Sequence, residues 1–273
     1  MTVCIAAICE SGKAMVLAAD AMITGEDLMI EYEFAASKLK QLTKNCVVAA
    51  AGNANLETDL IRMVRQAISE LKAPSRDKVI EKTRQTYRAL RERAIEDQIL
   101  LPKGIESMAK FYDTQKSMLE VVAKAAYKEI EEFDLELDLI IASVDSDGAH
   151  ITVVEDPGVA TTWDDLSYHA IGSGYTHADT TLIIQDYDAS CSLPEALLSV
   201  YTAKKAAEKA PGVGRKITHM AVIHKDGVIM LADEQVKKID EVYQERTAAL
   251  KNWERDKNWT SKLVGVVTLK PTD

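Results

Sequence analysis

Thr2 is the residue of this chain that could do chemistry with the least help from others. Removal of Met1 would make Thr2 the amino terminus. A threonine hydroxyl beside its own free α-amino group supplies a nucleophile and a general base within one residue. The ordinary pKa of an α-amino group is about 7.7–8.0, so a modest lowering of that pKa gives an effective base near neutral pH. The start of the chain therefore indicates a self-contained nucleophile.

Two short apolar segments must hold Thr2 in position. Residues 3–9 and 15–19 are rich in β-branched or small side chains, and the Glu-Ser-Gly sequence at 10–12 supplies a turn between them. This pattern predicts a β-hairpin that is buried on both faces and begins directly after Thr2. Chain ends usually fray unless they are tied down. A buried strand at this place would fix Thr2 at the end of a rigid element.

The composition narrows the class of protein. The chain has 273 residues, enough for one large domain or two small ones with a substantial core. Its 33 basic and 43 acidic residues give a net charge of -10, which argues against a nucleic-acid-binding surface. No apolar stretch is long enough for a transmembrane helix, and the first apolar run lacks the charged region that precedes it in a signal peptide.

The cysteines and histidines predict neither disulfides nor a metal site. The cysteines form no CxxC pair, and the histidines show no metal-binding spacing; they are Cys4, Cys9, Cys46 and Cys191, and His150, His169, His177, His219 and His224. Three of the cysteines lie in apolar runs. We therefore expect free, reduced thiols in a cytoplasmic protein, without a metal or another cofactor.

The first half of the chain is expected to pass from strands to helices. The polar stretch at 24–33 predicts a loop or a distorted strand, and the patterns at 38–42 and 46–51 predict two strands. From residue 56 the apolar period becomes helical, with one face formed by Leu56, Leu60, Ile61, Val64, Ala67, Ile68 and Leu71. Further helices are predicted at about 77–96 and 105–133.

The second half of the chain shows the same two kinds of pattern. Strands are predicted at 137–144, 149–154, 159–163, 167–170, 217–224 and 228–231. Helices are predicted at 172–185, 192–209 and about 234–257, the second beginning with a capping box of Ser192 and Glu195. Blocks of strands separated from blocks of helices favour an α+β fold in which helices cover two packed sheets. They do not favour an alternating βαβ sheet.

A set of short motifs follows the order found in one known superfamily. These are MTVC at the start, LAAD at 17–20, Lys38-Leu39, Ala51-Gly52 and Gly172-Ser173-Gly174. In this set the chain resembles the proteasome β-type N-terminal nucleophile (Ntn) hydrolases, which include proteasome β subunits, the bacterial HslV peptidase and the bacterial Anbu proteins. The resemblance covers about residues 2–72 and 137–232. It implies a single domain over 1–273, built as a four-layer αββα sandwich with a helical insertion at about 75–135 and a C-terminal helical extension at about 234–273.

The resemblance also assigns roles to individual residues. Thr2 would be the nucleophile, and the positive charge of Lys38 would favour the deprotonated forms of its hydroxyl and amine. Asp20 would pair with Lys38 and hold it in place. Gly52 would give a backbone N–H to the oxyanion of the tetrahedral intermediate, where the absence of a side chain permits close approach. Ser173 matches the family's supporting serine near the nucleophile.

The family analogy also suggests a pocket and exposes one departure. Ile23, Ala36 and Ala50 would line a pocket for apolar substrate side chains. Active members usually carry an Asp and then a Ser just before the last hairpin. Here the corresponding loop at 208–214 has Gly214 at the serine position and no aspartate, and Glu208 could substitute only if the loop shifts.

These observations lead to an expected function and two alternatives. We expect a threonine-type amidohydrolase, most simply a peptidase, that transfers an acyl group to Thr2 and then hydrolyses it. Its partners would be a peptide or protein substrate and further copies of the chain, in a ring or related assembly, with no nucleic acid or membrane; the sequence identifies no partner ATPase. The departure in the 208–214 loop instead favours a non-catalytic structural or binding subunit. A third reading is action on a small non-peptide amide, because one fold hosts several chemistries.

Overall fold

The structure is a computed structural model that describes residues 2–25, 30–33 and 36–256. It has the expected α+β class, and its three sheets are antiparallel. The first sheet has five strands in the order β10 (Tyr168–Ile171), β1 (Cys4–Cys9), β2 (Ala14–Asp20), β11 (Thr218–His224) and β12 (Gly227–Met230). The predicted hairpin of β1 and β2 is confirmed, with the short helix η1 (Glu10–Gly12) as its turn.

In the second five-stranded sheet, the strands predicted from the sequence lie side by side in the order in which they occur along the chain. Its strands are β5 (Leu39–Thr43), β6 (Cys46–Gly52), β7 (Leu137–Val144), β8 (Ala149–Glu155) and β9 (Val159–Thr162), and η6 (Asp164–Leu166) follows them. The third sheet is the hairpin of β3 (Met22–Gly25) and β4 (Ile30–Glu33). Of the loop or distorted strand expected at 24–33, the strand is confirmed at both described ends of the stretch, which pair as a regular antiparallel hairpin; residues 26–29 lie outside the described part.

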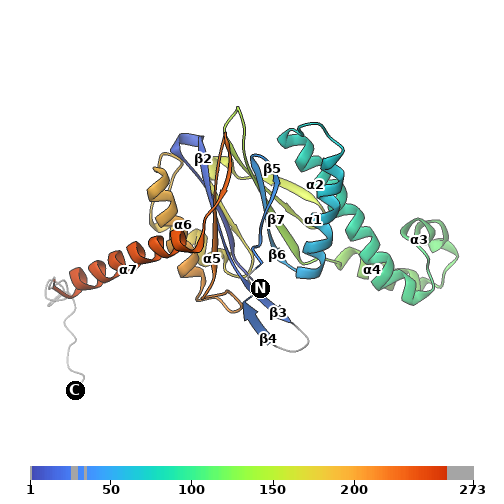
Figure 1. Ribbon diagram of the computed structural model, residues 1–273. Helices are drawn as coiled ribbons and strands as arrows, with labels where there is room; N and C mark the ends of the chain where they lie inside the picture. Colours follow the sequence, from blue (N-terminus) through green and yellow to red (C-terminus); the bar gives the residue numbers. More distant parts are fainter. Residues whose placement is uncertain (1, 26–29, 34–35, 257–273) are drawn as a thin grey trace, which may run out of the picture.

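Apolar side chains cover both faces of β1, as the continuous apolar run predicts. Side chains alternate along a strand, so Cys4 and Ala6 join an apolar cluster with strands of the second sheet, whereas Ile5 and Ala7 pack toward helices. Those helices are α5 (Tyr175–Ile184) and α6 (Leu193–Ala207), which lie along one side of the strands in Figure 1. The strand that follows Thr2 is therefore held from both sides.

Two further helices cover the other face of the second sheet (Figure 1). They are α1 (Ala54–Ser69) and α2 (Arg76–Ile95), capped by the side chains of Asn53 and Ser75. The apolar face predicted from residue 56 is confirmed at its centre, where Leu60, Ile61, Val64 and Ile68 are buried. These side chains pack against β6, the strand that ends at Gly52.

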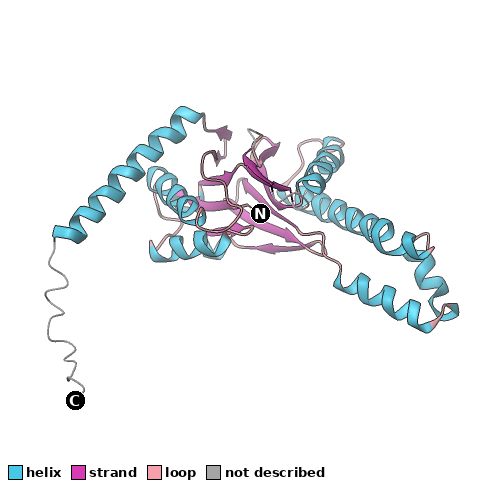
Figure 2. Ribbon diagram, turned by 90° about the horizontal axis from the view of Figure 1, so that it is seen from below, coloured by secondary structure: helices cyan, strands magenta, loops and turns pink. Residues whose placement is uncertain are grey.

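The helical stretch predicted over 105–133 is confirmed as helical but is broken into pieces. It contains α3 (Met108–Thr114), η5 (Gln115–Ser117) and α4 (Glu120–Glu132), and the short helices η3 (Glu96–Leu100) and η4 (Leu101–Lys103) precede it. Serine explains two of the breaks: Ser107 caps α3, and the Ser117 hydroxyl donates to the Thr114 carbonyl, so both side chains compete with helical backbone bonds. Figure 2 shows this segment extending away from the sheets.

The last described helix extends on the other side of the molecule. It is α7 (Asp233–Asp256), and its first half packs on α6, where Tyr201 donates to Asp240 at 2.8 Å. The capping box predicted at the start of α6 is confirmed, because the Ser192 backbone N–H donates to the Glu195 carboxylate at 2.8 Å. Across the described residues, none of the helices combines the length and the apolar character needed to cross a membrane.

Candidate active site

The start of β1 meets the end of β2 because the two strands are antiparallel, and this brings Thr2 to Asp20. The Thr2 hydroxyl donates to Asp20 Oδ1 and accepts from Lys38 Nζ. Lys38 Nζ also lies 2.9 Å from Asp20 Oδ1. Exposure is 2% for Thr2, 0% for Asp20 and 9% for Lys38. The structure therefore brings the three residues together in one buried group at the start of the chain.

Asp20 is bonded to the main chain as well as to side chains. Its Oδ1 accepts from the Val3 N–H at 3.0 Å, and its Oδ2 accepts from the N–H groups of Met22 at 3.0 Å and Gly214 at 2.8 Å. Burial by itself would raise the pKa of this carboxyl. The charge of Lys38 and the hydrogen bonds from Thr2 and Gly214 outweigh burial and hold the pKa of Asp20 below its usual range. Asp20 is therefore an anion beside Lys38 at neutral pH.

The Ser173 hydroxyl is hydrogen-bonded to the backbone nitrogen of Thr2. The Thr2 N–H donates to Ser173 Oγ at 3.2 Å; with Met1 in place this nitrogen is an amide, and it stands where the free α-amine would be. Ser173 Oγ also lies 3.2 Å from the Pro211 carbonyl oxygen. The Gly174 N–H donates to the Thr2 carbonyl at 3.1 Å, and a Cβ at Gly172 would lie 2.5 Å from that same oxygen. The Gly-Ser-Gly turn thus closes on the main chain of Thr2.

Gly52 ends β6 at the same end of the molecule as Thr2. Its φ is +124°, and a Cβ there would overlap the Glu136 carbonyl oxygen, so this backbone approach needs glycine. The Cys4 thiol donates to the Ala50 carbonyl at 3.3 Å and links β6 to the start of β1. The close approach of the backbone therefore explains by itself why position 52 needs glycine. Its oxyanion role stays a prediction.

The three predicted pocket residues have different surroundings. Ala50 is buried and packs with Val48 and Leu60 between β6 and α1. Ile23 is half-buried on β3, and Ala36 is exposed. Ala50 thus belongs to the core under α1, whereas the exposure of Ala36 does not suit the wall of an enclosed pocket. A shared apolar pocket stays a prediction.

The loop before β11 contacts the site through its main chain. A Cβ at Gly214, the serine position of the family pattern, would lie 3.1 Å from Asp20 Oδ2 and 3.1 Å from Glu33 Oε1, so a side chain there would require neighbours to move. Glu208 does not take the place of the missing aspartate. Its carboxylate binds Lys204 at 2.6 Å and Lys205 at 2.7 Å.

Two residues near this loop were missed by sequence reasoning. Lys204 is fully buried and donates to the Gly214 carbonyl at 2.9 Å. Its spacing of four residues from the buried Val200 was a usable signal, because it puts a lysine on the apolar face of a helix. Glu33 accepts from the N–H groups of residues 215, 216 and 217 at 2.6, 2.9 and 2.8 Å. It lies in a polar stretch, where one more carboxylate gives no signal.

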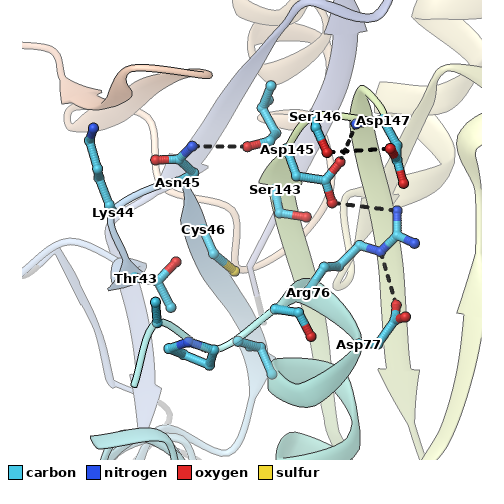
Figure 3. Close-up of a pocket in the computed structure, with 15 residues that line it drawn as sticks. Thr43, Lys44, Asn45, Cys46, Arg76, Asp77, Ser143, Asp145, Ser146 and Asp147 are labelled. Carbon is cyan, nitrogen blue, oxygen red and sulfur yellow. Dashed lines mark hydrogen bonds and ion pairs between the residues drawn. The ribbon is translucent and has the colours of Figure 1, made fainter. Parts of the chain in front are cut away.

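An open hollow of about 550 Å³ lies at the other end of the sheets (Figure 3). It is lined by the β5–β6 turn, the β7–β8 turn and the start of α2, and the β7–β8 turn contacts the β1–β2 turn at Gly12. Three of its charged groups form ion pairs: Arg76 lies 3.2 Å from Asp77 and 3.8 Å from Asp145. Thr2, Asp20 and Lys38 do not line it, so this hollow is separate from the buried group.

The other groups considered among the described residues are the thiols and the side chains that could bind a metal ion. The four cysteines are free, as expected, and three of them are buried. Within the described ranges, no group of three or more His, Cys, Asp or Glu side chains is arranged to hold a metal ion. A scan of the chain against protein-family models finds no match, and a search among curated proteins finds none either.

Proposed function

We propose that this protein is a threonine-type Ntn hydrolase that cleaves amide bonds, with peptides or proteins as substrates. The observation that carries the proposal is the position of the Thr2 hydroxyl, which contacts both Lys38 Nζ and the Asp20 carboxylate while the Thr2 nitrogen lies on Ser173. A buried hydroxyl held by a cation and an anion is arranged for proton transfer and nucleophilic attack.

The reaction proceeds after Met1 is removed. The hydroxyl oxygen of Thr2 attacks the substrate carbonyl carbon while the free α-amine takes the hydroxyl proton. The carbon–nitrogen bond breaks, the amine returns the proton to the leaving nitrogen, and an ester with Thr2 remains. Water then attacks the ester carbonyl, the bond from the acyl carbon to the Thr2 oxygen breaks, and the acyl group leaves as a carboxylic acid while the Thr2 hydroxyl is restored. Lys38 favours the deprotonated hydroxyl, and Asp20 supplies its counter-charge at 2.9 Å.

The arrangement of sheets and helices supports the same proposal. One apolar cluster lies between the two five-stranded sheets, and separate clusters join each sheet to its own helices. We interpret this as the four-layer αββα sandwich of the Ntn hydrolases. We also propose self-association, because Leu119 and Val121 at the start of α4 are 75% and 72% exposed.

A non-catalytic subunit is the second candidate, and the loop at 211–217 favours it. This loop offers neither an aspartate nor a serine side chain to the Thr2 group; it contributes the Gly214 N–H and the Pro211 carbonyl. In that case the hydrogen-bonded group at Thr2 would serve only to anchor the first strand.

Intact-mass measurement together with an N-terminal threonine probe tests the proposal. We expect loss of Met1, and labelling of wild-type protein by a peptide β-lactone with one adduct at Thr2. Thr2→Ala is expected to abolish both labelling and hydrolysis of fluorogenic peptide amides, whereas Thr2→Ser keeps a hydroxyl and retains part of the activity. Complete retention of Met1, or hydrolysis unchanged in Thr2→Ala, would overturn the proposal.

A further inference from the structure

Lys204 is a buried cation that the proposed reaction does not use. Its side chain has 0% exposure in α6, and Nζ donates to Glu208 Oε1 at 2.6 Å and to the Gly214 carbonyl at 2.9 Å. A buried ammonium group is costly unless it is paired and hydrogen-bonded. Both requirements are met here, and one of the two partners belongs to the loop that touches Asp20.

Gly214 connects Lys204 to the Thr2 group through its two backbone polar groups. Its carbonyl accepts from Lys204, and its N–H donates to Asp20 Oδ2 at 2.8 Å. Asp20 in turn accepts from the Thr2 hydroxyl and pairs with Lys38. An unbroken series of hydrogen bonds therefore runs from the carboxylate of Glu208 to the hydroxyl of Thr2.

The neighbouring lysine separates two explanations for the ion pair. Lys204 and Lys205 both bind the Glu208 carboxylate, at 2.6 Å and 2.7 Å. Cations in the last turn of a helix also interact favourably with the helix dipole, which applies to both. Stabilisation of the end of α6 accounts equally for the two residues. Of these two lysines, however, Lys204 is the one that donates to the Gly214 carbonyl in the described part of the chain, and it is the one that is fully buried.

We propose that Lys204 is a positioning residue, which fixes Gly214 so that its N–H stays bonded to the Asp20 carboxylate beside Lys38. This inference rests on the proposed function of Thr2. In this protein the Asp20 carboxylate is hydrogen-bonded by the backbone of the loop at Gly214, not by a loop side chain, and Lys204 holds that backbone in place. The Glu33 carboxylate accepts from the next three N–H groups of the loop.

The charges around the pair fix the expected pH effect. Lys204 faces Glu208 and Lys205 on its own helix and the more distant Asp20 on β2, and the carboxylate of Glu33 on β4 also interacts with its charge. Asp20 faces Lys38. Loss of the Gly214 N–H removes a bond that favours the anion, so the pKa of Asp20 rises. The titration of the Asp20 carboxyl is then expected to move to higher pH.

The test compares Lys204→Met with Lys205→Met in the full chain. For a fluorogenic peptide amide, Lys204→Met is expected to lower kcat about 10- to 100-fold, as loss of one hydrogen bond to a charged group would, with KM nearly unchanged and the titration of Asp20 shifted to higher pH. Lys205→Met is expected to leave kcat and the Asp20 titration close to wild type. Equal effects of the two substitutions would overturn the proposal and leave only the stabilisation of α6.

Two further measurements keep the test decisive. The pKa of Asp20 is read by carbon-13 NMR of its carboxyl carbon, assigned with Asp20→Asn. If Lys204→Met does not fold, Lys204→Gln replaces the ammonium group with a shorter, uncharged amide, and it is expected to raise the pKa of Asp20 in the same direction. A higher Asp20 pKa in either Lys204 variant supports positioning, and an unchanged value refutes it. An inactive, unlabelled wild type would instead refute the proposed function.

Discussion

Each end of the paired sheets has an aspartate paired with a basic residue, but one pair is buried and the other is partly exposed to solvent. At the Thr2 end, Asp20 has no exposed surface and accepts from three backbone N–H groups in addition to Thr2 and Lys38. At the end with the open hollow, the Asp145 side chain is 35% exposed and its ion pair with Arg76 spans 3.8 Å (Figure 3). Exposed pairs contribute little because water screens them, whereas a buried pair loses much when one partner is removed.

The strongest test of this comparison is removal of one carboxylate from each end. Asp20→Ala leaves Lys38 without its counter-charge and deprives Val3, Met22 and Gly214 of their acceptor. We expect it to lower the free energy of unfolding by about 3–5 kcal/mol, against about 0–1 kcal/mol for Asp145→Ala. Urea unfolding of the two variants measures both values. Similar losses at the two sites would show that burial does not distinguish the ends.

Glycines provide a second, smaller contrast between the same ends. Gly52 and Gly12 both have positive φ, at +124° and +85°, so alanine is strained at either place. A Cβ at Gly52 would overlap the Glu136 carbonyl oxygen, whereas a Cβ at Gly12 meets nothing within 4 Å. We expect Gly52→Ala to cost about 3 kcal/mol and Gly12→Ala about 1 kcal/mol of unfolding free energy.

Thermal and urea unfolding of this glycine pair are read together with Thr2 labelling. Because Gly52 shares its end of the molecule with Thr2, its substitution is expected to slow labelling as well, and Gly12→Ala is not. A stable Gly52→Ala protein would contradict the close approach of β6 to the residues before β7.

The sequence predicts structural features that depend on side chains better than it predicts hydrogen bonds made by the main chain. The apolar runs of β1 and β2 and the capping box at Ser192 have strong local patterns, and the structure contains all three. The contact of Thr2 with Asp20 then follows from the antiparallel pairing. By contrast, the Gly214 N–H on Asp20 has no signature, since every residue other than proline carries that donor.

The breaks in the segment after α2 were missed for a related reason. Its apolar residues have helical spacing, and a hydrophobic period continues across a break in the helix. The breaks depend on hydrogen bonds made by Ser107 and Ser117, residues that also occur on the exposed faces of intact helices. A small cluster around Phe111 and Ile130 then provides the core that the separate pieces need.

The pH dependence of stability gives the smallest and most specific contrast. The pKa of Asp20 is lowered in the folded protein, so its contribution is complete above the ordinary Asp pKa of about 3.9 and is lost as pH falls through the lowered value. Asp138 has the opposite sign: burial, with Glu155 and Asp134 nearby, raises its pKa to about 6. Stability tied to protonated Asp138 is therefore present below pH 4 and lost as pH rises toward 6.

We expect the unfolding free energy of Asp20→Asn to depend less on pH below about pH 4 than that of the wild type, by at most about 1.4 kcal/mol per pH unit for one proton. Asp138→Asn is expected to flatten the curve between about pH 4 and 6 instead. Urea unfolding at a series of pH values separates the two variants. If Asp138→Asn flattened the window below pH 4 as strongly as Asp20→Asn, the loss of stability in acid could not be attributed to the buried contacts of Asp20 with Lys38 and the main chain.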